Sequence, residues 1–278
     1  MTGVQTCDLP IFLGPSLGIR GAAIGTVVGA ALHLGIRVVG ILRTDLRLRP
    51  AFAVRTAAFR DFLRLMLPKM AAHPIEPLTF LFFTQLATTL GAGTVSSLSF
   101  ARNFQSVPVN LIGAAFSIAV FPTLSAAAAI GDRAAFSRIL GRNLATIGAL
   151  SVAAAVALAV IGGAAIRILL GGGAFDEAAA SRTSALVVAF AVSVPFDALA
   201  SPLARGFYAT KNTLWPVFAS VASLGVIVAT TSALVPVLGA RAIPVGFALG
   251  AAAKVAIMAA MLPARVRRLG MPAPDTGS

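Results

Sequence analysis

Long apolar runs dominate the hydrophobic pattern of the chain, and short polar segments separate them. A membrane-spanning helix needs about 20 mostly apolar residues, and seven stretches meet that length. We therefore predict an all-α, polytopic membrane protein with about seven transmembrane helices. The connections, including the amphipathic stretch 127–142, are too short to form a second domain. The predicted segments are 19–42, 62–90, 95–126, 143–170, 182–206, 213–236 and 240–262.

The first and last of these segments resemble each other. LGIRGAAIGTVVGAALHLGI, from Leu17, aligns without gaps with LGARAIPVGFALGAAAKVAI, from Leu238. Both copies run in the same direction because the second copy lies six helices, an even number, after the first, and such parallel repeats build transporters from two halves. The segment 19–42 is then the last helix of a first half, and the other six form the second half. Helices rich in glycine and alanine also resemble one another by composition alone.

Basic residues follow an alternating pattern along the connections. If successive connections lie on opposite sides of the membrane, fourteen basic residues fall on one side and four on the other. Cytoplasmic loops carry the excess of lysine and arginine, so we predict a cytoplasmic C-terminus and place Asp176 and Glu177 outside. The residues on the basic side are Arg43, Arg47, Arg49, Arg55, Arg60, Arg64, Arg133, Arg138, Arg142, Arg205, Lys211, Arg265, Arg267 and Arg268.

Composition agrees with this assignment. Hydrophobic residues make up 58% of the chain and charged residues 11%, a ratio that a water-exposed surface would not tolerate. The net charge of +13 comes from basic residues at the ends of apolar runs without interleaved aromatics, so no nucleic-acid partner is expected. No nucleotide, metal or nucleophile motif is present, and we expect no enzyme, no cofactor and no metal site.

The first twelve residues, MTGVQTCDLPIF, do not resemble the rest of the chain. They have neither a basic region nor a continuous apolar segment, so they do not form a signal peptide, and the single Cys7 cannot form an internal disulfide. We set them apart as a non-native leader. The predicted organisation is this leader at 1–12, the last helix of a first lobe at 13–42, a basic cytoplasmic loop at 43–61, a six-helix lobe at 62–262 and a cytoplasmic tail at 263–278.

Charged groups at membrane depth are costly and usually face an interior cavity. The segment 62–90 carries Lys69, His73 and Glu76, which share one face at 100° per residue. Three prolines interrupt the same segment, so we predict a broken helix that lines a cavity or packs against other helices. Alternatively, Lys69 and Glu76 form a self-neutralised pair with a structural role.

The segment 95–126 carries a continuous small and polar face, with Arg102 and Gln105 beside it. A guanidinium in this position suits bidentate binding of a phosphate or carboxylate. Faces of this kind also serve plain helix packing. The residues of the face are Ser99, Asn103, Ser106, Asn110, Gly113 and Ser117.

Three further polar residues lie in later segments. Asp197 follows Pro195, and Lys254 occupies the repeat position equivalent to His33, so both are candidates for a polar interior. Arg205 lies close enough to the cytoplasmic end of its helix to reach the membrane surface with its long side chain.

Three stretches carry a family resemblance: FRDFLRLMLPKM (59–70), SLSFARNFQSVPVNLIGAAFSIAVFPTLS (97–125) and LLGGGAFDEAAASRTSALVVAFAVSVPFDALASPLARGFYATKNTLWPV (169–217). They resemble the MviN/MurJ family of lipid II flippases, in the superfamily of the polysaccharide-precursor and multidrug (MATE) exporters, over residues 17–262. The resemblance implies a two-lobed inner-membrane transporter that moves the undecaprenyl-pyrophosphate-linked peptidoglycan precursor to the outer leaflet by alternating access. The chain then carries the last helix of the first lobe and the whole second lobe.

The sequence departs from the family pattern in two places. The family segment that matches FARNF reads like YADRL, so the usual aspartate falls on Arg102 and the usual functional arginine on Asn103. The carboxylates proposed to bind sodium in some members align with Phe83 and Thr231. A sodium site therefore does not carry over.

The residues and the resemblance together predict the site and its partners. The expected partners are an undecaprenyl-pyrophosphate-linked glycan and membrane lipids. The predicted substrate-binding residues are Lys69, Arg102, Asn103 and Lys254. The predicted polar or coupling residues of the cavity are His73, Glu76 and Asp197.

Other functions fit the same pattern. The cavity chemistry would also serve a flippase or exporter of another lipid-linked polysaccharide, and the departures from the family fit an inactive membrane fragment or scaffold. A membrane-embedded transferase would need clustered acidic residues for metal-diphosphate chemistry, whereas the cytoplasmic loops carry mainly arginines.

Overall fold

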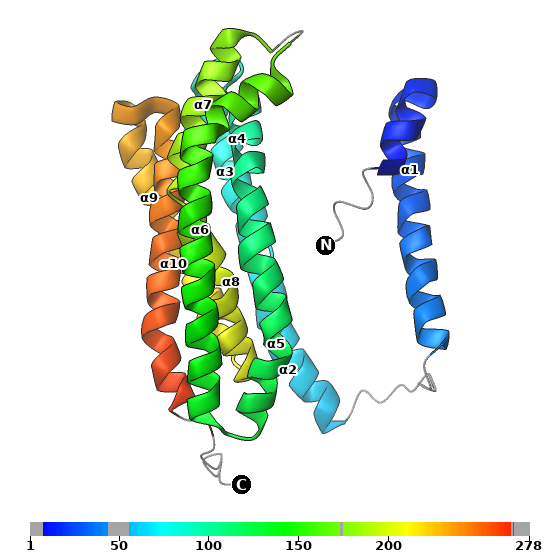
Figure 1. Ribbon diagram of the computed structural model, residues 1–278, viewed down its shortest axis with the longest axis vertical. Helices are drawn as coiled ribbons and strands as arrows, with labels where there is room; N and C mark the ends of the chain where they lie inside the picture. Colours follow the sequence, from blue (N-terminus) through cyan, green and yellow to red (C-terminus); the bar gives the residue numbers. More distant parts are fainter. Residues whose placement is uncertain (1–7, 44–55, 173–174, 268, 270–278) are drawn as a thin grey trace. The chain divides into compact units, whose positions relative to one another are not determined.

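The computed structural model describes residues 8–43, 56–172, 175–267 and 269 (Figure 1). The chain divides into two compact units, residues 1–55 and residues 56–278. The described residues form helices joined by short turns and contain no β-strand, which confirms the all-α prediction.

The described part of the first unit is one long helix, α1 (Asp8–Leu42). Its large apolar side chains are widely exposed, with Val27 at 69% and Ile36 at 72%. Such a surface suits lipid or the apolar face of another helix. Because α1 begins at Asp8, it includes the last residues of the stretch 1–12 that the sequence argument set aside as a leader.

The second unit is a helical bundle. Its elements are α2 (Ala57–Ala72), α3 (Ile75–Thr89), α4 (Thr94–Pro108), the π-helical turn η1 (Val109–Ala114), α5 (Ala115–Ala129), α6 (Arg133–Leu170), α7 (Glu177–Ala191), α8 (Val194–Ala209), α9 (Leu214–Leu238), the 3₁₀ turn η2 (Gly239–Arg241) and α10 (Ala242–Val266).

The predicted segment 62–90 is broken into α2 and α3, as its prolines predicted. Pro74 lies at the break and lacks the N–H group that a continuous helix would require. Lys69 and Glu76 therefore belong to different helices. The continuous Lys69–His73–Glu76 stripe predicted for one helix is not formed.

The helices α4 and α5 form one run that η1 interrupts directly after Pro108. At this turn the chain approaches α8 very closely: a Cβ atom on Gly113, in η1, would lie 2.8 Å from both Cα and the carbonyl oxygen of Ala198. Small residues allow helix backbones to approach in this way. The contact brings the middle of this run against the first half of α8.

The helix α6 begins earlier than the hydrophobic pattern predicted. The Asp132 side chain caps it by accepting a hydrogen bond from the Ala135 N–H at 2.9 Å. The amphipathic stretch 127–142, predicted to be a connection, thus supplies the end of α5 and the first turns of α6. After α6, α7 and α8 form one span bent by 46°.

The helices α9 and α10 form an antiparallel hairpin. A Cβ atom on Gly246 would collide with Thr231, and one on Gly250 would collide with Ile227, so the register runs in opposite directions along the two helices. The Ser223 hydroxyl also donates a hydrogen bond to the Gly250 carbonyl oxygen at 2.8 Å. The small residues of α10 therefore set the spacing of this pair.

Four runs of the described chain are long and apolar enough to cross a membrane, and the bent α7–α8 pair makes a fifth. The longest run, Leu214–Val266, is the α9–α10 hairpin and so supplies two crossings. The broken α2–α3 pair occupies the remaining predicted segment. Helices follow in the predicted order through all seven segments, and the polytopic architecture is confirmed.

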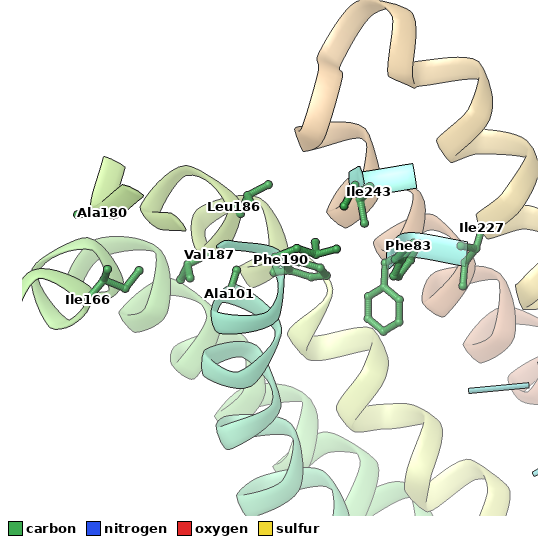
Figure 2. Close-up of a cluster of buried hydrophobic side chains, with 12 residues drawn as sticks. Phe83, Ala101, Ile166, Ala180, Leu186, Val187, Phe190, Ile227 and Ile243 are labelled. Carbon is green, nitrogen blue, oxygen red and sulfur yellow. The ribbon is translucent and has the colours of Figure 1, made fainter. Parts of the chain in front are cut away.

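Two apolar clusters stabilise the second unit at different heights. Figure 2 shows one of them, where side chains of α4, α6 and α7 gather on one side and Phe83, Ile227 and Ile243 on the other. The second cluster includes Leu124, Phe136, Leu140, Leu203, Phe207, Met258 and Leu262. Along α4–α5, α7–α8 and α10, polar residues lie between the positions that contribute to the two clusters.

Candidate functional site

A cavity of about 850 Å³ lies in the second unit, lined by α3, α4, η1, α8, α9 and α10. Its walls combine aromatic and aliphatic side chains with polar groups, as in binding sites for amphipathic ligands. The polar side chains that line it are His73, Glu76, Thr79, Arg102, Ser106, Asn110, Asp197, Ser201, Ser220, Ser223 and Lys254.

Arg102 lies at the centre of a hydrogen-bond network between α4 and α8. Its Nη1 donates to Oδ2 of Asp197 at 3.4 Å and also to Oε1 of Gln105. The amide nitrogen of Gln105, a fully buried side chain, donates to Asp197 Oδ2 and to Ser193 Oγ, both at 3.2 Å. We refer to Arg102, Gln105, Ser193 and Asp197 as the Arg102 network.

Two further groups face the Arg102 guanidinium. The ring of Phe247 lies beneath it, with 4.4 Å between Cζ and the ring centroid, a cation–π contact. Glu76 Oε1 lies 3.9 Å from Nη2, but its side chain is 88% exposed, so water screens this ion pair. The Asp197 pair is better protected, with side chains 22% and 27% exposed.

The cavity has no large excess of either charge. The cations Arg102 and Lys254 are matched in number by the carboxylates of Glu76 and Asp197. Balanced charge lowers the cost of placing ionised groups at membrane depth. A negatively charged ligand can therefore bind Arg102 only in place of, or beside, the Asp197 carboxylate.

The structure gathers five of the seven predicted site residues around one cavity. Arg102 and Lys254 line it together with the three predicted polar or coupling residues. Two predicted substrate-binding residues lie elsewhere: Asn103 is exposed outside the lining, and Lys69 is exposed with its Nζ over the ring of Tyr208. The predicted Lys69–Glu76 pair is not formed, because each residue has a different neighbour.

Three residues that the sequence argument did not assign complete the site. The sequence places Gln105 beside the polar face of the segment 95–126, and it gives no prediction of a site role for Ser193 or Phe247. Ser193 stands at the bend between α7 and α8, next to Pro195, which is the only sequence signal for its position. Phe247 is a single aromatic side chain in a helix otherwise rich in glycine and alanine.

Phe83 and Thr231, where the family resemblance predicted that sodium-binding carboxylates are replaced, are both buried. Phe83, 3% exposed, packs edge-on against Phe247 with 6.1 Å between ring centroids. Thr231 is fully buried against Gly246, and its hydroxyl has no hydrogen-bond partner among the described residues. Among all the residues that the structure describes, no group of three or more acidic, His or Cys side chains could hold a metal ion.

The bundle resembles solved transporters. It matches the lipid II flippase MurJ in an inward closed conformation with a TM-score of 0.69 and 20% identity, over 97% of this chain and 57% of that one. It matches a MOP superfamily transporter from Pyrococcus furiosus with a TM-score of 0.81 and 14% identity, over 98% and 63%. The fold is thus that of multi-pass membrane proteins that have been solved as transporters.

Sequence comparison identifies the family within this class. A family model described as lipid II flippase MurJ matches residues 9–273. The lipid II flippase MurJ of Burkholderia cenocepacia is 25% identical over 247 residues, 87% of this chain and 48% of that protein. The chain belongs to the MurJ family, a family of transporters and not of enzymes, and spans about half the length of the curated relatives it matches.

Proposed function

We propose that this protein takes part in moving lipid II from the cytoplasmic to the outer leaflet of the bacterial inner membrane by alternating access. Family membership and the transporter fold support the proposal. The observation that carries it is the guanidinium of Arg102, held in a cavity of the bundle by side chains that leave its second terminal nitrogen without a hydrogen bond among the described residues.

The diphosphate of such a lipid is the group that Arg102 would bind. Guanidinium groups recognise phosphate oxygens with two parallel hydrogen bonds. In the observed arrangement Asp197 and Gln105 both accept from Nη1, whereas Nη2 faces only the exposed Glu76. An incoming phosphate would bind at Nη2 and then replace the carboxylate of Asp197. Arg102 is the proposed substrate-binding residue, and Asp197 its exchangeable partner.

Lys254 supplies the second positive charge of the cavity. It lines the cavity from α10, whereas Arg102 lines it from α4. Serine side chains from α8 and α9 lie in the same wall and offer hydrogen bonds to sugar or peptide groups. Of the predicted substrate-binding residues, we retain Arg102 and Lys254 in this role and remove Lys69 and Asn103.

The proposed orientation places the C-terminus in the cytoplasm. It rests on the excess of basic residues at one set of helix ends. A reporter enzyme that is active only outside the cytoplasm, fused after Ser278, should remain inactive. The same reporter in the connection between α6 and α7 should be active, and the reverse pattern would contradict this orientation.

Genetic replacement tests the transport proposal. We expect the chain to restore growth in bacteria depleted of their own lipid II flippase, and we expect Arg102→Ala to abolish this rescue at equal expression. Arg138→Ala removes the same charge from an exposed site on α6 and should leave the rescue intact. Failure of the unaltered chain to restore growth would favour the reading as an inactive fragment.

A transporter of another lipid-linked polysaccharide is the second candidate. The observation that favours it is the departure from the family pattern at Arg102 and Phe83, two residues that line the cavity. Rescue of a strain that lacks a polysaccharide-precursor exporter, without rescue of the lipid II flippase strain, would select this function.

A further inference from the structure

A second group of cations lies at the C-terminal end of α8, outside the Arg102 network. Lys69 Nζ lies 5.2 Å from the ring centroid of Tyr208. Arg205 lies three residues before Tyr208, on the same face of α8. The guanidinium of Arg205 also lies 5.8 Å from the ring of Phe121. We refer to Lys69, Arg205 and Tyr208 as the Tyr208 cluster.

The cations of the Tyr208 cluster have aromatic neighbours. Within the described residues, neither Lys69 nor Arg205 forms a salt bridge. The Nε atom of Arg205 is buried and has no hydrogen-bond partner in that same part of the chain. A buried donor without an acceptor costs free energy, and charged donors cost more. The cluster therefore has the features of a site that an anionic oxygen would complete.

Aromatic residues place this cluster at the level of lipid headgroups. The chain has one tyrosine and one tryptophan. Tyr208 lies in the last turn of α8 and Trp215 in the first turn of α9. Both residue types are enriched at membrane–water interfaces.

The helix that carries Lys69 also exposes large apolar side chains. Leu67 and Met70 on α2 are 59% and 58% exposed. A helix that exposes both charge and large apolar side chains suits contact with lipid. This combination suits the phosphate of a lipid better than a water-soluble anion.

We propose that the Tyr208 cluster binds the phosphate of a lipid headgroup. Lys69 and Arg205 supply positive charge, and the phenol of Tyr208 can donate a hydrogen bond to a phosphate oxygen. Basic pockets between transmembrane helices on the cytoplasmic side bind anionic headgroups in this way. The phosphate can belong to a membrane phospholipid or to a diphosphate-linked polyprenyl lipid. The inference goes beyond the proposed function because it requires no transport.

Lipid binding to the purified full chain tests the proposal. Native mass spectrometry would measure the affinities for phosphatidylglycerol, geranylgeranyl diphosphate, phosphatidylcholine and inorganic pyrophosphate. One basic residue near an anionic surface contributes about fivefold in affinity. We therefore expect the double variant Lys69→Gln/Arg205→Gln to bind one of the two anionic lipids about thirtyfold more weakly. Arg138→Gln/Arg142→Gln, which removes two exposed arginines of α6, is the matched control.

The outcomes show which lipid supplies the phosphate and which results would overturn the proposal. Weakening for phosphatidylglycerol alone assigns the site to phospholipid, and weakening for geranylgeranyl diphosphate alone assigns it to the polyprenyl lipid. Equal affinities of the double variant and the control for both lipids would overturn the proposal, as would tighter binding of pyrophosphate than of either lipid. Lys69→Gln alone changes an exposed side chain, so its expected fivefold loss tests the site even if the double variant does not fold.

Discussion

The Arg102 network and the Tyr208 cluster hold two arginines of the same bundle in opposite electrostatic environments. Arg102 has the Asp197 carboxylate, the Gln105 amide and an aromatic ring around it. Arg205 has aromatic neighbours and a buried Nε without a partner among the described residues. A guanidinium with an internal carboxylate can exchange that partner for a ligand and take it back, whereas one without a partner favours a ligand that stays. Under our two proposals, the first environment suits transient binding and the second a resident lipid.

Removing the positive charge of the network should have the largest effect. We expect Arg102→Ala to weaken the binding of undecaprenyl diphosphate about a hundredfold, because a charged hydrogen-bonded group that meets the ligand is lost while Asp197 remains. Binding isotherms with the purified chain would measure this. Binding to Arg102→Ala at the wild-type affinity would remove Arg102 from the site, and Arg138→Ala serves as the exposed control.

Separating η1 from α8 should have the next largest effect. Gly113→Ala would place a Cβ atom 2.8 Å from the Ala198 backbone, beside Asp197, and should lower the free energy of unfolding by about 2 kcal/mol. Gly141→Ala is the matched control, because a Cβ atom there meets nothing within 4 Å and alanine favours the helix. Denaturant titrations in detergent would compare the two variants, and equal stabilities would contradict the close contact.

Removing the internal carboxylate should strengthen anion binding. In Asp197→Asn the side chain keeps its size and a hydrogen-bond acceptor for Arg102, but it no longer competes as an anion. We expect the affinity for undecaprenyl diphosphate to rise about tenfold, which corresponds to the loss of one moderately screened charge pair. Unchanged or weaker binding would mean that Asp197 only positions Arg102.

The smallest expected effect is at the aromatic ring under Arg102. Phe247→Leu keeps an apolar side chain but removes the cation–π contact, which is worth about 1 kcal/mol. We expect about fivefold weaker binding of the same lipid. Phe218→Leu, at an exposed aromatic residue of α9, should leave the affinity unchanged, and equal losses in both variants would point to a general packing effect.

The fold was predictable because lipid imposes a simple rule on the sequence. Each spanning helix needs a long apolar run, and these runs identified all seven segments in order. The start of α6 was predicted too late. Its first turns, from Arg133, carry charged residues, so the apolar pattern begins after the helix does. The π-helical turn after Pro108 was missed because a proline predicts a disturbance but not its type.

The sequence predicted several residues of the site but not the contacts between them. Charges at membrane depth indicated Arg102, Asp197 and Lys254, and all three line one cavity. Lys69 was predicted to line the same cavity, whereas its Nζ lies over the ring of Tyr208 and the lining of the cavity begins one helical turn later, at His73. The hydrogen bond between Gln105 of α4 and Ser193 at the bend before α8 depends on tertiary packing, which no local sequence pattern encodes.

A double-mutant cycle between Arg102 and Asp197 tests the central claim most directly. The affinity for undecaprenyl diphosphate would be measured for the wild-type chain, Asp197→Asn, Arg102→Gln and the double variant. If Asp197 is the exchangeable partner of Arg102, then Asp197→Asn strengthens binding about tenfold when Arg102 is present and changes it less than about twofold when Arg102 is replaced. The same strengthening in both backgrounds would contradict the exchange of a carboxylate for a phosphate at Arg102.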